Sequence, residues 1–254
     1  MPINKRLKNI LEILENEEGS RVADLSRQLN VSEATIRRDL HALEVENKIK
    51  RVHGGAILTE RSPFEPPIHK RIRQYEREKQ AIGRETATLI ANGETVFLGS
   101  GTTTLEVAKH LNNRENLSLI TNSLLVAQLL ATSGFINLIF LGGFLRSSEL
   151  SFIGHITEQA ISEVRVDKIV IGIPAIDVKV GLTNDYLPEV RTDRAILSMS
   201  DKLIVVADHT KFGKIASAYL APITRITTLV TDKQTDSDTL DRIRAEGIEV
   251  IIAT

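Results

Sequence analysis

Two stretches of this sequence carry side chains suited to binding anions, and the first is a run of small and hydroxyl-bearing residues. It reads Gly99-Ser100-Gly101-Thr102-Thr103-Thr104, between an apolar strand pattern and a helical pattern. Small residues let backbone N–H groups approach an anion, hydroxyls add donors, and a helix N-terminus adds positive potential. The sequence therefore predicts a phosphate-binding loop, with a plain strand-to-helix turn as the structural alternative.

Two nucleotide-binding motifs do not match this loop. No Gly-Lys-Ser/Thr follows it, as a Walker loop requires, which argues against nucleotide hydrolysis. The third glycine of a dinucleotide fingerprint is missing, and the next predicted strand ends in Ile120-Thr121-Asn122 where a ribose-binding acid would stand. A dinucleotide-dependent redox sensor therefore lacks its fingerprint.

Polar residues and a glycine pair also follow other predicted strands, at the carboxyl ends where open α/β sheets bind ligands. They are Asn122, Ser123, Gly142, Gly143, Asp185, Glu189, Asp208, Lys211 and Lys214. For each, a satisfied turn or surface residue is the alternative. Their positions nevertheless favour a ligand-binding loop over a plain turn.

The second stretch is a predicted helix with two adjacent arginines. Ser32 is a good N-cap residue for its start. Ile36, Leu40 and Leu43 follow at the spacing that places three side chains on one face of a helix. This face is expected to point into the core.

The opposite face of this helix carries side chains that suit DNA. Arg38 and His41 are expected to point outward, with Thr35 and Arg37 on the flanks. The planar fork of arginine can donate two parallel hydrogen bonds to guanine, and the major groove admits one helix. We therefore predict that Arg38 reads a base and that Arg37, Ser32 and Thr35 contact phosphates. A solvated helix face is the alternative for an isolated arginine pair.

The neighbouring elements favour DNA binding. Amphipathic helical patterns cover residues 4–16 and 20–29, and a short turn precedes the basic helix. Residues 48–57 alternate polar and apolar around a glycine pair, which is typical of a hairpin. This order of elements is that of a winged helix-turn-helix. The predicted wing contributes Lys50, Arg51, His53, Gly54 and Gly55.

A proline-rich segment separates this region from the rest. Pro63, Pro66 and Pro67 lie among charged neighbours, a composition that resists regular structure. We expect a DNA-binding domain at 1–58, a linker at 59–74 and a second domain at 75–254. Residues 1–80 hold 16 basic and 13 acidic residues and residues 81–254 hold 16 and 20, so the front is +3 and the back −4.

Beyond the linker, helical patterns alternate with short, β-branched, nearly all-apolar runs. Such runs are typical of parallel strands that are buried on both faces. The fold class is therefore α/β, with a mostly parallel sheet in the second domain. The predicted strands are 95–98, 117–121, 136–141, 168–173, 202–207, 228–231 and 249–252.

Composition sets outer limits on the function. The chain has no cysteine, which excludes disulfides, thiolate metal sites and a cysteine nucleophile and suits a reducing compartment. Its start lacks the apolar core of a signal peptide, and no apolar run approaches the roughly 20 residues of a membrane span. We expect a cytoplasmic protein with no membrane partner, cofactor or metal.

The two stretches together resemble a known family. Thr35-Ile36-Arg37-Arg38-Asp39-Leu40, followed after twelve residues by His53-Gly54-Gly55-Ala56, is similar to the signature of DeoR-family regulators. The segments at the later strand ends resemble the sensor domain of that family, whose fold is similar to ribose-5-phosphate isomerase. The resemblance implies a repressor of a carbohydrate or polyol operon that is relieved by a phosphorylated sugar-type effector.

The resemblance also assigns roles to residues. It implies that Ser100 to Thr104 hold a phosphate and that Lys211 or Lys214 adds a cation. Sugar hydroxyls would contact Asn122, Asp177, Asp185 and Glu189. Because a single winged domain makes few phosphate contacts, we expect a homodimer or homotetramer on operator DNA.

An enzyme is the competing interpretation. A sugar-phosphate isomerase with a DNA-binding appendage would use Asp177, Glu189 and Lys211 as acid and base groups near the phosphate loop. Turnover of sugar phosphates by the second domain would support this alternative, and saturable binding without turnover would count against it.

Overall fold

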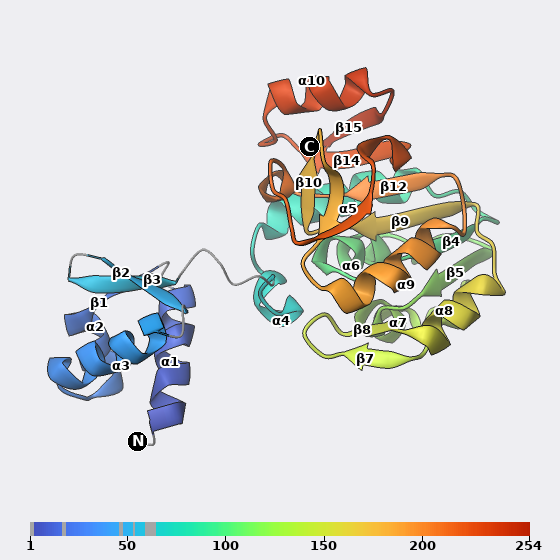
Figure 1. Cartoon of the computed structure of the whole chain (residues 1–254). Helices are drawn as coiled ribbons and strands as arrows, with labels where there is room; N and C mark the ends of the chain where they lie inside the picture. The colour runs from blue at the N-terminus through green and yellow to red at the C-terminus, as the bar shows by residue number, and fades with distance from the viewer. Residues whose placement is uncertain (1–2, 17–18, 46–47, 53, 59–64) are drawn as a thin grey trace. The chain divides into compact units, whose positions relative to one another are not determined.

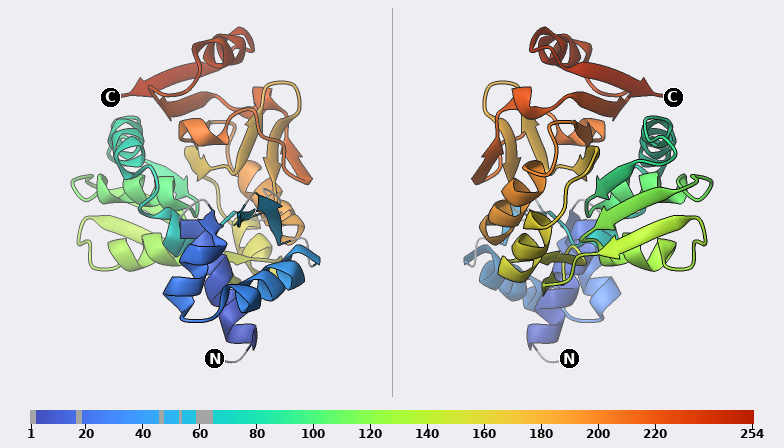
Figure 2. Two further views of the ribbon diagram at one scale, coloured as in Figure 1. Left: turned by 90° about the vertical axis from the view of Figure 1, so that its left-hand side faces the viewer. Right: turned by 90° about the vertical axis from the view of Figure 1, so that its right-hand side faces the viewer.

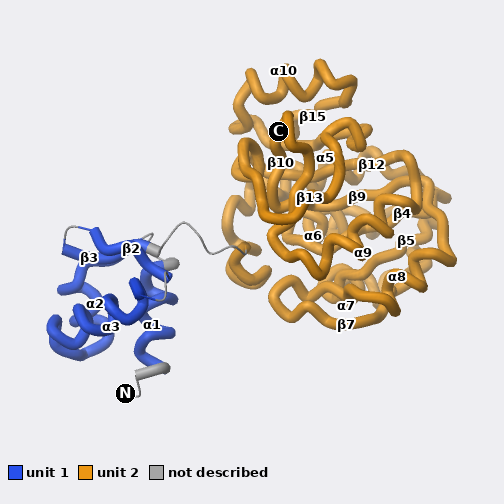
Figure 3. Tube along the Cα trace, in the orientation of Figure 1, with its two compact units in different colours: residues 1–64 blue, residues 65–254 orange. Residues whose placement is uncertain are grey.

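The computed structural model describes residues 3–16, 19–45, 48–52, 54–58 and 65–254 (Figure 1). The chain divides into two compact units, Met1–Phe64 and Glu65–Thr254 (Figure 3). Among the described residues, no helix is both long and apolar enough to cross a bilayer.

The N-terminal unit packs three helices against a small antiparallel sheet. Its elements are α1 Ile3–Asn16, β1 Ser20–Arg21, α2 Val22–Leu29, α3 Glu33–Val45, β2 Ile49–Val52 and β3 Gly55–Leu58. The strand order is β1-β3-β2, with β2 and β3 forming the hairpin. The apolar stripes of the helices meet in one core that includes Ile10, Leu25, Ile36, Leu40 and Leu43. The periodicity in the sequence therefore specifies this unit.

The C-terminal unit is built around a parallel sheet. Within residues 65–254, which the structure describes throughout, seven strands lie in the order β15-β14-β12-β9-β4-β5-β6, and every neighbouring pair is parallel. These strands are β4 Thr95–Leu98, β5 Leu117–Thr121, β6 Ile136–Phe140, β9 Lys168–Gly172, β12 Leu203–Val206, β14 Thr228–Asp232 and β15 Glu249–Ala253. Each lies on a segment predicted as a strand, and the α/β fold class is confirmed.

Helices cover both faces of this sheet. Successive residues of a strand point to opposite faces, so the nearly all-apolar strands present apolar side chains on both sides. Val96 and Leu98 of β4 pack in a core with α5 Glu76–Thr88, α6 Thr102–Lys109 and α7 Leu124–Leu130. Phe97, between them, packs in a second core with α8 His155–Ser162, α9 Leu187–Leu197 and α10 Ser237–Ala245. Figure 2 shows the teal α5 and the orange α9 on opposite sides of the sheet.

Several shorter elements complete the unit and do not belong to the predicted strands. They are helix α4 Ile68–Arg71, the hairpin β7 Phe144–Arg146 and β8 Ser151–Ile153, the antiparallel sheet β10 Ala175–Asp177, β11 Gly181–Asn184 and β13 Ala218–Ala221, and the 3-10 turns η1 His209–Lys211 and η2 Ile223–Arg225. The added strands are three or four residues long with mixed polarity, which leaves little periodicity to detect.

Part of the segment predicted as linker packs on the C-terminal unit. The boundary between the units falls after Phe64, and residues 65–74 belong to the second unit. Ile68 is 1% exposed, and its N–H donates to the carbonyl of Ser148 at 2.7 Å. Residues 65–67 have no regular structure and residues 68–71 form a helix, and the proline content of the segment does not reveal the buried Ile68.

Candidate DNA-binding surface and effector pocket

Helix α3 presents the predicted DNA-reading side chains to solvent. Ser32 caps the helix, since its Oγ accepts from the N–H of Thr35 at 3.3 Å and lies 2.9 Å from the Thr35 hydroxyl. Arg38 and His41 are exposed, and Arg37 makes an exposed ion pair with Glu33 at 3.3 Å. The helix thus places these groups where DNA can reach them, and their contact with DNA stays a prediction.

Asp39, in the middle of the same motif, points the other way. Its carboxylate accepts from the guanidinium of Arg6 on α1 through two hydrogen bonds, one of 2.9 Å, and the two side chains are 8% and 11% exposed. This bidentate pair fixes α3 to α1. This role of Asp39 cannot be recognised from the sequence, because its partner lies 33 positions away and no local motif indicates it.

The hairpin β2–β3 carries the remaining predicted DNA contacts. Lys50 and Arg51 on β2 are exposed. Gly54 has a φ of +79°, which favours glycine, whereas Gly55 pairs with Arg21 of β1 and lies against the backbone of Ser20. His53 lies outside the described residues. Lys50 and Arg51 are therefore accessible, while Gly55 serves the sheet.

A polar pocket opens in the C-terminal unit where the strand order reverses. The chain runs outward from β4 to β5 and β6 on one side and from β9 to β12 on the other. Open α/β sheets bind ligands at this switch point, beyond the carboxyl ends of the strands. Gly99 to Thr103 after β4 and Ile171 to Pro174 at the end of β9 both line the pocket.

The predicted phosphate loop lines this pocket. Gly101, with a φ of +128°, precedes the first turn of α6, and the Thr104 hydroxyl donates to its carbonyl at 3.0 Å. Ser100, Thr102 and Thr103 line the pocket beside it. Hydroxyls and the helix N-terminus therefore converge as an anion site requires.

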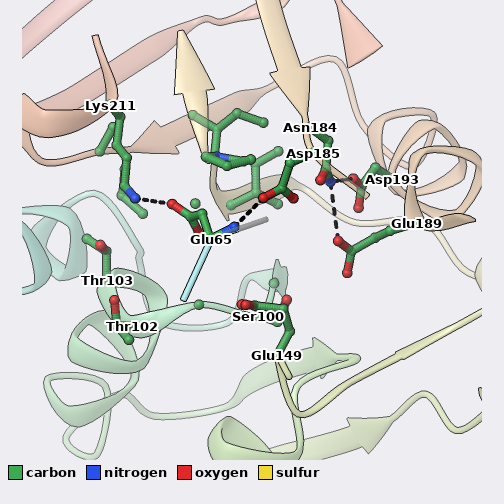
Figure 4. A pocket seen from close by; sticks show the side chains of 18 of the residues that line it. Glu65, Ser100, Thr102, Thr103, Glu149, Asn184, Asp185, Glu189, Asp193 and Lys211 are labelled. Atoms are coloured by element: carbon green, nitrogen blue, oxygen red, sulfur yellow. Dashed lines mark hydrogen bonds and ion pairs between the residues drawn. The ribbon is translucent and has the colours of Figure 1, made fainter. Parts of the chain in front are cut away.

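Charged side chains surround the loop. Among residues 65–254, the pocket lining contains five carboxylates and three cations: Glu65, Glu149, Asp185, Glu189, Asp193, Arg71, Arg146 and Lys211. Each cation is paired with a carboxylate of the same pocket. Figure 4 shows one of these pairs, between Lys211 and Glu65. The site therefore contains its own counterions.

Glu189 on α9 is bound by three neighbouring side chains. It accepts from Arg146, from the Ser151 hydroxyl at 3.2 Å and from the Asn184 amide at 3.2 Å. The same Asn184 amide donates to Asp193 at 2.8 Å. These contacts hold two carboxylates of α9 side by side at the edge of the pocket.

The carboxylates differ in their pKa values. Burial, and then the charge of Glu189, raise the pKa of Asp193 well above its ordinary range. Burial also raises the pKa of Asp185 and of Glu149. A carboxyl group with a raised pKa retains its proton to a higher pH than the same group does in water.

Two polar atoms of the pocket lack partners. Asn122 Oδ1 and Glu149 Oε1 are buried and make no hydrogen bond within the described part of the chain. Both residues line the pocket. Buried acceptors without partners are costly, so these two suit a ligand that brings hydroxyl donors.

About half of the predicted effector residues line this pocket. They are Ser100, Gly101, Thr102, Thr103, Asn122, Asp185, Glu189 and Lys211. The remaining predicted residues are not among its lining: Thr104, Ser123, Gly142, Gly143, Asp177, Asp208 and Lys214.

Several residues outside the lining make local structural contacts. Ser123 caps α7 by accepting from Val126 N–H at 3.3 Å, and Asp208 accepts from Thr210 N–H at 3.0 Å. Asp177 accepts from two backbone N–H groups of the following turn, each at 2.9 Å. Of the three acid and base candidates of the enzyme alternative, Glu189 and Lys211 line the pocket and Asp177 does not.

Gly142 and Gly143, which also do not line the pocket, make close contacts with Thr157. The carbonyl of Gly142 accepts from the Thr157 hydroxyl at 2.8 Å. A Cβ at Gly143 would lie 2.1 Å from the Oγ1 atom of Thr157. Lys214 is exposed. Position after a strand identifies these residues as turn residues but does not separate turns that face a ligand from turns that close the fold.

The charged and amide-bearing pocket residues missed from the sequence are Glu65, Arg71, Arg146, Glu149, Asn184 and Asp193. Most lie in the segment predicted as linker or in the short hairpins. Glu65, Arg71, Arg146 and Glu149 have partners at least 43 positions away, so no local signal identifies them. Asn184 and Asp193 bond to each other across nine positions.

A winged helix-turn-helix unit joined to an α/β unit with a polar pocket defines a ligand-responsive DNA-binding regulator. Comparisons with known proteins agree with this class. Residues 6–62 match the model of the DeoR-like helix-turn-helix domain, and residues 74–233 match that of the DeoR C terminal sensor domain. The chain therefore belongs to the DeoR family, which confirms the predicted resemblance.

Relatives match over nearly the whole chain. A glycerol-3-phosphate regulon repressor of Escherichia coli is 38% identical over 91% of this chain and 92% of its own length. An uncharacterized HTH-type transcriptional regulator of Haemophilus influenzae is 32% identical over 98% and 96%. Among solved structures, a ribose 5-phosphate isomerase A of Methanocaldococcus jannaschii is similar at a TM-score of 0.41, with 18% identity over 55% of each chain.

Proposed function

We propose that this regulator is a repressor of a carbohydrate or polyol operon, which it releases when a phosphorylated sugar or polyol binds the pocket. The accessible face of α3 and strand β2 would hold operator DNA. The loop at Ser100 to Thr103 would hold the phosphate. The ligand must favour one state of the protein over another, since equal affinity for both would shift nothing.

The observation that carries the choice of ligand is the pair of unpartnered acceptors beside an anion-binding loop. Asn122 Oδ1 and Glu149 Oε1 can accept from hydroxyls, while the loop donates to an anionic group. A molecule with both features is a phosphorylated polyol or sugar. The name of the Escherichia coli relative, a glycerol-3-phosphate regulon repressor, supports the same ligand class.

The proposed action is binding without turnover, by a homodimer or homotetramer on operator DNA. A single recognition helix with one wing makes few phosphate contacts, so repeated half-sites bound by symmetric copies supply affinity and selectivity. Relatives named as repressors support regulation rather than catalysis.

A thermal-shift screen of phosphorylated sugars, phosphorylated polyols and their unphosphorylated counterparts tests the ligand class. A ligand at about 100 times its Kd stabilises the native state by about 2.7 kcal/mol, which raises the Tm by several degrees. We expect this rise with phosphorylated members alone. The hit should also release operator DNA in a gel-shift assay.

Thr103→Glu places a carboxylate in the predicted phosphate site, so the stabilisation by the hit should disappear while operator binding persists. The matched control is Thr88→Glu, at an exposed position near the end of α5 outside the pocket. A Thr103 variant that responds like the control would show that the phosphate site is misplaced.

A further inference from the structure

Glu65 brings the start of the C-terminal unit into the pocket. It is the first residue of this unit, directly after the segment that follows the DNA-binding hairpin. Its carboxylate pairs with Lys211 and lies 2.7 Å from the Arg71 guanidinium, and its backbone N–H donates to Asp185 (Figure 4). The side chain is 20% exposed. A residue of the interdomain connection is therefore part of the ligand site.

Glu65 occupies cations that an anionic ligand would use. Arg146 is held by Glu189, and Arg71 is shared between Glu65 and Glu149. Lys211 pairs with Glu65 alone among the carboxylates of residues 65–254. An incoming phosphate must therefore displace a carboxylate before it can pair with a pocket cation.

Displacement of Glu65 would disturb less of the fold than displacement of Glu189. Glu189 lies within α9 and accepts three hydrogen bonds, whereas Glu65 lies in irregular backbone before α4. The chain just beyond it is held independently: Ile68 is buried, and Arg71 donates to the carbonyl of Pro66 at 2.7 Å. Residue 65 can therefore leave while α4 stays docked.

We propose that Glu65 is an internal competitor for the anionic group of the effector, and that its displacement from Lys211 transmits pocket occupancy to the connection with the DNA-binding unit. The inference rests on the proposed function and adds its regulation. Ligand and Glu65 exclude one another at the same cation, so each weakens the binding of the other. Because the effector releases DNA, engagement of Glu65 accompanies the DNA-binding state.

The electrostatics of Glu65 agree with this role. Burial opposes its ionisation, yet Lys211 and Arg71 outweigh burial and hold the pKa of this carboxyl below its ordinary value. It therefore carries a full negative charge at neutral pH. A phosphate competes with this charge for the same lysine.

Titration with inorganic phosphate compares the full-length wild type with Glu65→Gln. If Glu65 blocks the site in about nine-tenths of the wild-type molecules, the wild type binds phosphate about tenfold more weakly than an open site does. The variant, which lacks the competing charge, should therefore bind phosphate about tenfold more tightly. It should also bind operator DNA more weakly without ligand. Glu246→Gln, at an exposed position after α10, is the control and should match the wild type.

Equal or weaker phosphate binding by Glu65→Gln, with binding by the wild type intact, overturns the competitor and leaves the proposed function standing. If neither protein binds phosphate or any phosphorylated member of the screen, both the proposed function and the competitor fail. If only the variant binds phosphate, the competitor is supported in its strongest form.

A measurement on the wild type covers the case in which the variant does not fold. The Glu65 N–H is protected by its bond to Asp185, so residue-resolved hydrogen exchange should become faster there when phosphate is added. The Ile68 N–H, bonded to Ser148, is the internal control and should change little. Slower or unchanged exchange at Glu65 would identify it as a ligand contact or a bystander.

Discussion

The two units of this protein use their charged residues in opposite ways. On α3 the Arg37 side chain is 54% exposed, and Arg38 makes no ion pair with any residue that the structure describes. In the pocket, Arg71 and Arg146 are 9% and 8% exposed, and both are held by carboxylates. The arginines of α3 are accessible to negative charge from a binding partner, whereas the pocket arginines already have carboxylate partners within the protein.

This difference implies two kinds of recognition. Exposed cations attract DNA phosphates and release counterions, so their contribution falls as salt rises. Buried ion pairs are screened far less, and a ligand must replace an existing partner with good geometry. Cations on the predicted DNA-binding face of α3 and β2 would therefore contribute affinity for DNA of any sequence. The paired cations of the pocket would favour selection among small anions.

Asp39→Ala probes the exception within the N-terminal unit, the buried pair with Arg6. The change removes both hydrogen bonds between Asp39 and the Arg6 guanidinium, which should destabilise the unit by about 3 kcal/mol. Calorimetry of the full chain measures this loss. Glu33→Ala, which removes an exposed partner from the same helix, should cost about 0.5 kcal/mol. Equal costs would erase the contrast between buried and exposed pairs.

Arg38→Ala tests the exposed cations of α3. If Arg38 reads a base, operator affinity falls by about 2 kcal/mol and discrimination against other sequences declines. Arg37→Ala should instead weaken binding to all sequences alike and reduce the salt dependence. Gel shifts over a range of salt concentrations distinguish the two. Loss of selectivity with Arg37→Ala rather than Arg38→Ala would reverse their roles.

Asp193→Asn tests the buried charges of the pocket. Burial and Glu189 raise the folded-state pKa of Asp193 above its ordinary 3.8, so between these values the folded state binds more protons and stability falls as pH rises. The amide avoids this cost. The variant should be more stable than the wild type at pH 8, with a smaller difference near pH 4. Urea unfolding at both pH values measures this difference, and a pH-independent gain would exclude titration as its cause.

The layout of the fold can be predicted from sequence, because short apolar runs and helical stripes are local signals. All seven strands of the parallel sheet lie where their β-branched residues predict them. Helix α3 begins after the capping serine, with Ile36 and Leu40 buried as their spacing requires. Such elements depend on burial patterns that neighbouring residues share.

The candidate site is predicted only in part, because its charges meet across long separations. The loop at Ser100 to Thr103 has a local composition and is identified, whereas Glu65 and Lys211 are 146 positions apart. Arg146 and Glu189 are joined in the same way across 43 positions. The register of the short hairpins decides such pairs, and three-residue strands contain too little pattern to fix it.

The close approach at Gly55 has a consequence for genetics. A Cβ there would lie 2.3 Å from the Ser20 carbonyl oxygen, whereas nothing lies within 4 Å of such an atom at Gly54. A selection for loss of repression would therefore recover alanine at position 55 as a folding defect with low protein abundance. Charge reversal at Lys50, which is exposed, would give an abundant, folded protein with impaired DNA binding. Measuring protein abundance beside the phenotype separates these two classes of allele.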